Sequence, residues 1–422
     1  MTATKTEVSA PIEAVPVESS PGDAFTSAQR FKYIVILGAL AALGPFTIDL
    51  YLPAFPNVAE DLNASDAAIQ ITLTATLVGF ALGQLIVGPL ADAFGRRRPL
   101  LIATGVHVIA SLAVAFAPTI ELVTIGRVFQ GIGAAGSGVV AMAIVRDLFA
   151  GQRLIRMLSR LALVWGLAPV LAPVIGSQLL RIVDWRGIFI VLAGFGLAMV
   201  IVAAFFMIET LPAERRGAFS GRAVARRYRH LVRDRSFVGA ALLGSMVFTA
   251  LFGYLSSSSF VLQDLFGLSA QEFGIAFGVN SLGLVAATQI SARLMRRFAP
   301  KSVATAGVLI MSAGALSLFV AGLVDGGLAW VLVSLFFVVS PLGIIMPTVQ
   351  VTALANHAEE AGTAASLIGA LNSLVPGLVT PLIGVMGVSV MSMASVMVGA
   401  LAIAHLALWF IVRPNAPSGV VA

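Results

Sequence analysis

The stretch GPLADAFGRRRPL, residues 88–100, is a short basic turn between two long apolar runs. The upstream run, residues 67–87, is long enough to cross a bilayer, and the downstream run, residues 100–116, is marginal but adequate. Three adjacent arginines cannot lie in hydrocarbon, so the turn lies in water, and the positive-inside rule predicts that this water is cytoplasmic. The orientation of this turn sets the orientation of every other segment.

The composition indicates an integral membrane protein. Of the 422 residues, 59% are hydrophobic and 11% are charged, and the mean hydropathy is +0.99. An ordinary soluble domain has about 25% charged residues. The net charge of +6 is explained by basic cytoplasmic loops, which the insertion rule and anionic lipids favour, rather than by nucleic acid binding. The absence of cysteine excludes disulfides.

Apolar runs of about 20 residues predict twelve transmembrane helices. An even number places both termini in the cytoplasm, and the charges support this topology. Of the 26 Lys and Arg, only Arg127, Arg181 and Arg186 fall outside the segments assigned to the cytoplasm. The predicted spans are 32–54, 67–88, 99–117, 122–147, 156–180, 187–208, 237–262, 270–292, 302–323, 328–352, 363–386 and 389–411.

The spans divide into two sets of six. A polar linker with eight arginines, residues 210–236, separates an N-terminal bundle, residues 31–209, from a C-terminal bundle, residues 237–413. Residues 1–30 are predicted to be a disordered cytoplasmic tail, since they lack an apolar core, and residues 414–422 a second cytoplasmic tail. The basic turn RLMRRF, residues 293–298, lies about 200 residues after the first basic turn and indicates a 6+6 duplication. Such folds bind substrate between the halves, near the midplane.

Two opposite charges are predicted at membrane depth in the first bundle. Asp49 lies about 25 Å along the first helix from Lys32, and Arg127 is the only Lys or Arg at membrane depth. A buried charge costs about 2.5–3.5 kcal/mol on insertion scales unless it is paired or hydrated. Burial favours the neutral acid, whereas a nearby guanidinium favours the carboxylate. One interpretation is a proton site; the alternatives are a static ion pair bracing spans 1 and 4, or an Asp49 that faces a wet vestibule.

The pattern Gly-x-Leu-Ala-Asp-x-x-Gly-Arg-Arg-x-x-Leu within residues 88–100 resembles the loop signature of the major facilitator superfamily. Residues 79–89, GFALGQLIVGP, are similar to the Bcr/CflA family of drug:proton antiporters. Residues 48–56, IDLYLPAFP, resemble the acidic end of span 1 in that family, and residues 127–135, RVFQGIGAA, resemble its span-4 motif, whose arginine is implicated in proton transfer. A second acid found earlier in span 1 of related exporters is missing here, since residues 37–46 are uncharged.

The resemblance assigns a latch and a bend. In the family, the acid of the basic turn meets the N-terminal end of span 11, here near residues 362–366, across the interface between the halves. A solvated loop acid is the alternative. The residues assigned to the latch are Gly88, Asp92, Gly95, Arg96, Arg97 and Arg146. The second motif, residues 166–176, is similar to the Gly/Pro antiporter motif, with Ala172 in place of the usual Gly. Its Gly166, Pro169, Pro173 and Gly176 predict either a bend on which the halves rock or a fixed kink.

A cavity for an apolar ligand combines aromatic side chains with a few polar groups. The candidates are Tyr51, Trp165, Tyr254, Ser256 to Ser259 (with Ser257 as the representative), Gln263, Asn280, Gln350 and Asn372. Each of them has an alternative role in packing or in helix–helix hydrogen bonding. The histidines within spans, His107 and His405, are interpreted as satisfied interior residues.

The sequence contains no nucleophile triad, no metal-spaced His/Glu cluster and no Walker A motif, so we expect neither an enzyme nor a metal or cofactor site. An ion gradient is then the energy source. The resemblance implies a monomeric, proton-coupled exporter of amphipathic drugs in the plasma (inner) membrane. The alternatives are a proton-driven exporter of a metabolite such as a sugar or amino acid, and a membrane sensor that does not transport.

Overall fold

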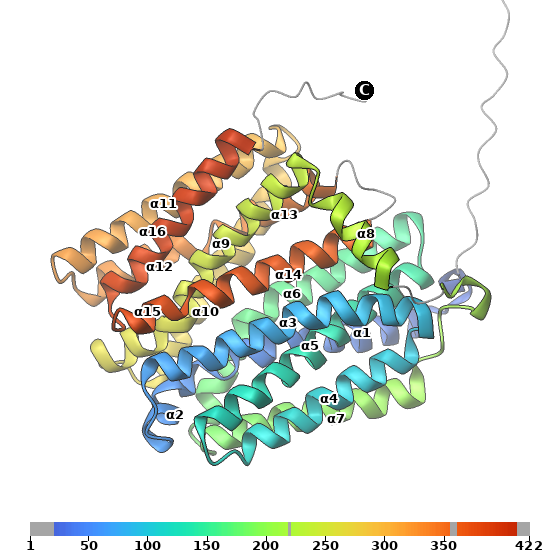
Figure 1. The fold of residues 1–422 in the computed structure, drawn as a ribbon, viewed down its shortest axis with the longest axis horizontal. Helices are drawn as coiled ribbons and strands as arrows, with labels where there is room; N and C mark the ends of the chain where they lie inside the picture. Colours follow the sequence, from blue (N-terminus) through green and yellow to red (C-terminus); the bar gives the residue numbers. More distant parts are fainter. Residues whose placement is uncertain (1–20, 218–220, 355–360, 412–422) are drawn as a thin grey trace, which may run out of the picture.

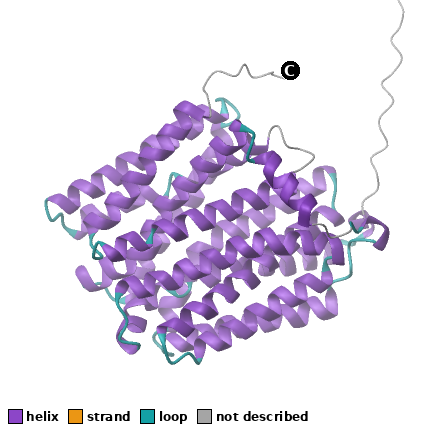
Figure 2. Ribbon diagram, viewed as in Figure 1, coloured by secondary structure: helices purple, strands orange, loops and turns teal. Residues whose placement is uncertain are grey.

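The computed structural model describes residues 21–217, 221–354 and 361–411. Within these ranges the chain is helical and forms no strand (Figure 2), as the sequence predicts. Most of the predicted N-terminal tail, residues 1–20, and all of the C-terminal tail, residues 414–422, lie outside the described residues.

Seven α-helices and several short turns make up the chain before the linker. Their bounds are η1 Pro21–Ala24, α1 Ser27–Asp49, η2 Leu52–Ala54, α2 Phe55–Asp61, α3 Asp66–Phe94, α4 Arg97–Ala115, α5 Ile120–Leu148, α6 Gly151–Leu179 and α7 Trp185–Phe206. The predicted linker contains a 3₁₀ turn, η3 Ala213–Arg215, and a basic helix, α8 Gly221–Leu231.

The chain after the linker repeats this layout with more helix breaks. The elements are α9 Arg235–Phe260, η4 Val261–Leu265, α10 Ala270–Leu294, α11 Pro300–Leu323, α12 Leu328–Val339, α13 Leu342–Leu354, α14 Ala361–Val379, α15 Pro381–Val385, α16 Val390–Leu406 and η5 Ala407–Ile411. Pro341 lies between α12 and α13, and Pro381 begins α15, so two of the predicted spans are each built from two helices.

The helices match the twelve predicted spans. Among the described residues, eleven helical segments are long and apolar enough to cross a membrane, and Gly166–Leu179, the apolar part of α6, is shorter. It belongs to a helix of 29 residues, which is long enough to cross as well. The predicted break between spans 4 and 5 falls at residues 149–150. The break between spans 11 and 12 falls at residues 386–389, where Gly387 adopts a φ of +80°.

The helices form two groups, one from each half of the chain. In Figure 1, α1 and α3–α7 lie on one side and α9–α16 on the other. The groups meet mainly where α3 packs against α14 and α6 against α10. Within the first group, α5 packs against α1, α3 and α4, so it contacts most of its own bundle and carries Arg127 in its interior.

The first helix begins earlier than the predicted tail boundary after residue 30. Thr26 caps it: its side chain accepts a hydrogen bond from the Gln29 N–H, and the Gln29 side chain accepts one from the Thr26 N–H. The ring of Phe25 stacks on Tyr33, with centroids 5.1 Å apart. A capping box with a local apolar contact is a standard helix start, and it orders this part of a segment that composition alone predicts to be disordered.

Candidate functional site

Asp49 and Arg127 are both buried in the first bundle. Asp49 is the last residue of α1 and has 4% of its surface exposed, while Arg127 in α5 has none. Among the described residues they form no ion pair with each other. Instead, Arg127 Nη1 donates to the carbonyl oxygen of Thr47, at 2.8 Å, two residues before Asp49. The static ion pair considered from the sequence is therefore not formed in this structure.

The guanidinium of Arg127 is only partly satisfied. Its Nη1 also donates to Gln130 Oε1 at 2.7 Å, and its carbon lies 5.0 Å from the ring centre of Tyr51 and 5.6 Å from that of Phe189. Its Nε and Nη2 are buried without a hydrogen-bond partner. Aromatic faces stabilise a buried cation, but unpaired buried donors are costly. Arg127 thus retains unused donors directed into a low-dielectric site.

Two of the polar residues considered for the substrate cavity, Tyr254 and Asn280, contact each other. Tyr254 and Asn280 are buried in the second half, where Asn280 Nδ2 donates to the Tyr254 hydroxyl at 3.1 Å. Asn372 accepts from Ser245 Oγ at 3.3 Å. The second half therefore buries a neutral polar pair, Tyr254 and Asn280.

The other cavity candidates lie in different settings. Tyr51 packs its ring against Phe55 and Phe189 beneath Arg127. The hydroxyl of Ser257 donates to the carbonyl of its own helix at Gly253, and Gln350 is exposed. The side chain of Trp165 lies outside the described part of the structure.

Gln263 connects the two halves at the end of the molecule opposite to the basic turn. Its Nε2 donates to the carbonyl of Pro53 at 3.2 Å and to Ser259 Oγ at 2.6 Å. The rings of Phe55 and Phe260 meet beside it, with centroids 5.8 Å apart. These contacts join the α1–α2 connection directly to α9, so a movement of one bundle against the other must break them.

The predicted bend lies within a continuous helix, α6, that contains both Pro169 and Pro173. Proline has no N–H, so Pro173 leaves the carbonyl of Pro169 without its usual helical donor. Ser281 Oγ, from α10 in the second half, lies 3.5 Å from this carbonyl and donates to it. A proline that weakens one helix thus provides an acceptor for the other bundle.

The two glycines of the bend differ in their surroundings. A Cβ built on Gly176 would lie 2.2 Å from the carbonyl oxygen of Leu50, so only glycine allows α6 to approach the end of α1 this closely. A Cβ on Gly166 would meet only Val285, at 3.8 Å. Gly176 therefore lies directly against the segment that carries Asp49, and Gly166 lies in looser packing.

The basic turn is held by carboxylates from three places. Arg96 pairs with Asp92 one turn earlier, and its Nε donates to Asp147 Oδ2 at 2.8 Å. Thr210 Oγ1 also donates to Asp147 Oδ2, at 2.9 Å. Among the described residues Asp92 makes no hydrogen bond to α14, the contact that the family resemblance implies. The two acids that pair with the Arg96 side chain, Asp92 and Asp147, therefore both belong to the first bundle.

Glu209 caps the start of α4 from a distance in sequence. Its carboxylate accepts from the backbone N–H groups of Arg96 at 2.8 Å, Leu211 at 3.0 Å and Arg97 at 3.3 Å. Burial opposes its ionisation, but these N–H groups, with Arg216, outweigh burial and hold the pKa of Glu209 below its ordinary value. Gly95 has a φ of +87°, and a Cβ there would lie 2.4 Å from Glu209 Oε2, so this position requires glycine.

Two of the remaining latch residues, Gly88 and Arg146, approach the second half. A Cβ on Gly88 would lie 3.9 Å from Ser366 Oγ, and a Cβ on Gly362 would lie 3.6 Å from Arg146 Nη1. Arg97 donates to the carbonyl of Ala204. Of the predicted latch, Gly88 and Arg146 therefore lie at the α14 interface, whereas Arg96 and Arg97 bind their own bundle.

Four residues of this site, Asp147, Glu209, Thr47 and His107, belong to none of the sequence motifs described above. Asp147 and Glu209 are ordinary acids at helix ends, although Asp147 directly follows Arg146 and is the only acid there. Thr47 contributes its carbonyl and hydroxyl, and His107 contributes one ring nitrogen. A backbone acceptor has no sequence signature, so only the fold could identify these partners.

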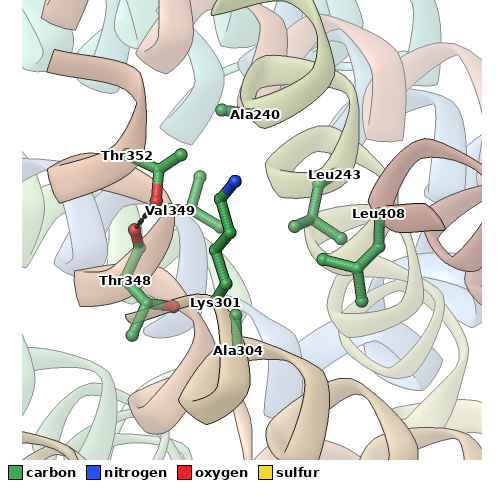
Figure 3. A pocket seen from close by; sticks show the side chains of 8 residues that line it. All are labelled: Ala240, Leu243, Lys301, Ala304, Thr348, Val349, Thr352 and Leu408. Carbon is green, nitrogen blue, oxygen red and sulfur yellow. Dashed lines mark hydrogen bonds between the residues drawn. The ribbon is translucent and has the colours of Figure 1, made fainter. Parts of the chain in front are cut away.

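A small pocket lies elsewhere, inside the second bundle (Figure 3). Lys301 points into it beside Thr348 and Thr352, whose side chains come from α13, and Leu243 and Leu408 close the apolar side. None of the predicted substrate residues lines this pocket.

Comparisons with known proteins agree with this geometry. A family model described as Major Facilitator Superfamily matches residues 36–381. An uncharacterized MFS-type transporter, YdgK, of Bacillus subtilis is 36% identical over 88% of this chain and 93% of its own length. A bicyclomycin resistance protein homolog of Haemophilus influenzae is 30% identical over 92% and 98%. A multidrug resistance protein, MdtL, of Klebsiella pneumoniae is 28% identical over 91% and 96%.

Solved structures show the same fold. The partially occluded, inward-open xylose transporter XylE of E. coli superimposes with a TM-score of 0.72 at 14% identity, covering 91% of this chain and 98% of its own. The fold and the buried charges define a multi-pass membrane transporter. The chain belongs to the major facilitator superfamily, and the resemblance to its drug:proton antiporters is confirmed by the named relatives.

Proposed function

We propose that this protein exports amphipathic drugs in exchange for protons, by alternating access of the two bundles. The observation that carries the proposal is a buried carboxylate, Asp49, two residues after the carbonyl of Thr47, which binds a fully buried arginine with unused donors, Arg127. Relatives named for bicyclomycin and multidrug resistance support drugs as the substrate class. The proposed location is the plasma membrane, with a monomer whose termini are both cytoplasmic.

Asp49 is proposed to carry the proton. The charged carboxylate is unstable in a buried site without a partner, so the neutral acid is favoured when Asp49 is enclosed as it is here. A movement that brings the free Nε and Nη2 of Arg127 onto Asp49 would favour the carboxylate and release the proton. Exchange follows if substrate binding between the halves drives that movement and proton return from outside reverses it.

The moving parts are proposed from the contacts between the halves. Opening the end opposite to the basic turn requires Gln263 to leave Pro53. The Ser281 contact with Pro169 lies at the proline bend and serves as the pivot region of α6. At the basic end, Arg146 and Gly88 approach α14 and form the proposed latch.

Export in a sensitised host tests this function. The full chain is expressed in bacteria that lack their own multidrug exporters, and growth is scored against a panel of cationic, neutral and anionic antibiotics. We expect resistance to several amphipathic compounds, and their accumulation should return to the level of the vector control when a protonophore collapses the gradient. Export that persists without a proton gradient would contradict the coupling, and export of sugars or amino acids alone would contradict the substrate class.

A further inference from the structure

A closed ring of hydrogen bonds joins α1, α4 and α5 around Arg127. His107 Nε2 lies 2.9 Å from Thr47 Oγ1, and Arg127 Nη1 binds the Thr47 carbonyl and Gln130 Oε1. Gln130 Nε2 donates to Ser111 Oγ at 2.7 Å, and Ser111 Oγ donates to the His107 carbonyl at 2.7 Å. All five side chains are completely buried, so each bond forms away from competing water.

The ring determines which nitrogen of His107 carries hydrogen. The single hydroxyl hydrogen of Thr47 is directed at the carbonyl of Leu43, 2.6 Å away, and that carbonyl can only accept. Thr47 Oγ1 must therefore accept from His107, which assigns the hydrogen to Nε2. Nδ1 then holds a lone pair in the neutral ring, and it has no partner. The expectation that His107 is fully satisfied is thus correct for only one of its two nitrogens.

The free side of the imidazole faces a glycine. A Cβ built on Gly196 of α7 would lie 2.9 Å from His107 Nδ1 and 2.9 Å from Val108 Cγ2, distances that force a shift of the ring, of the Val108 side chain or of the helix. Gly194, one half-turn earlier, has open space around its own Cβ position. The imidazole is thus held by Thr47 on one side and fits against bare backbone on the other.

We propose that His107 is a positioning residue for proton-coupled transport. Its Nε2–H holds Thr47, and the Thr47 carbonyl holds Arg127 two residues from Asp49. The inference rests on the proposed function, because His107 is taken to hold Arg127 where it can act on Asp49 as that residue binds and releases the proton. His405, the other histidine within a span, bonds through Nδ1 to the carbonyl of Leu401 in its own helix, so it provides a matched control.

Transport by purified full-length protein in proteoliposomes tests this role. His107→Leu removes the donor, whereas His107→Gln keeps a side-chain N–H at about the same reach. We expect His107→Leu to lower kcat by about fivefold, the usual effect of one net hydrogen bond, with little change in KM and with fewer protons moved per drug. His107→Gln should restore most of this loss, and His405→Leu should match the wild type.

A second pair of variants changes no hydrogen-bonding group. Gly196→Ala should reproduce the loss in kcat because its methyl group presses on the imidazole as well as on Val108, and Gly194→Ala should not. Adding Val108→Ala to Gly196→Ala removes the valine contact and should leave the loss in kcat in place. Wild-type kcat and proton ratio in His107→Leu, or no rescue by His107→Gln in a protein with the wild-type melting temperature, would overturn the positioning role alone. Absence of substrate-driven proton movement in the wild type would instead contradict the proposed function and the positioning role with it.

Discussion

The first basic turn, residues 88–100, is held by Asp92, Asp147 and Glu209, whereas the second basic turn, residues 293–298, has no carboxylate partner in the part of the chain that the structure describes. Arg293, Arg296 and Arg297 are exposed and, among the described residues, make no ion pair. The interiors differ in the same way. The first bundle encloses Asp49 and Arg127, while the second buries the neutral pair of Tyr254 and Asn280.

This difference indicates that the helix layout of a bundle does not depend on the charges that it carries. In a fold built from two six-helix repeats, apolar burial determines the helix layout, so one repeat can lack the charges of the other without loss of the fold. We propose that the half with the buried charges is the one that binds the proton. The first two predictions below compare a charged position in the first half with an exposed charged position in the second.

The largest effect is expected from Asp49→Asn. Removing the only carboxylate proposed to carry the proton should reduce gradient-driven export by about 100-fold or more, the usual cost of a lost proton-transfer group. Drug binding, measured by calorimetry in detergent, should remain close to that of the wild type. The control is Asp264→Asn, the same change at an exposed position of the second half, which should export normally. Full export by Asp49→Asn would remove this residue from the mechanism.

Replacing the anchored arginine should cost more stability than replacing its counterpart. Arg96→Ala leaves Asp147, whose side chain is 17% exposed, without its cation, and a partly buried charge that loses its partner costs about 2 kcal/mol. Arg296→Ala changes an exposed residue and should stay within about 0.5 kcal/mol. Melting temperatures of the two purified variants measure the contrast. Equal losses would show that the anchors of the first turn contribute nothing to stability.

A smaller, pH-dependent effect is expected from Glu209→Gln. The folded state holds the pKa of Glu209 below its ordinary value, about 4.3 in an unfolded chain. The stability that it contributes is therefore fully present above that value and is lost as pH falls through the folded-state pKa. The melting temperature of Glu209→Gln should lie below that of the wild type at pH 7, and the gap should narrow as pH falls below about 4. A gap that widens in acid would contradict the lowered pKa of Glu209 in the folded state.

The membrane spans could be predicted from the sequence because each depends on a long apolar run bounded by charge or by Gly and Pro. Asp49 and Arg127 could be identified for the same reason, since a charge within such a run is conspicuous. Their partners could not: Arg127 binds a backbone carbonyl at Thr47, and Arg96 binds acids 51 and 113 residues away. Contacts of this kind depend on which helix faces touch, and several helices with similar apolar patterns allow many such pairings.

Proton release on drug binding tests the central claim most directly. Purified protein in weakly buffered detergent solution is mixed with an exported drug, and the pH change is recorded with an indicator dye beside a parallel binding measurement. We predict that the wild type releases protons as it binds the drug, and that Asp49→Asn binds the drug and releases none. Equal release by both proteins would contradict the account, because the proton would then come from a group other than Asp49.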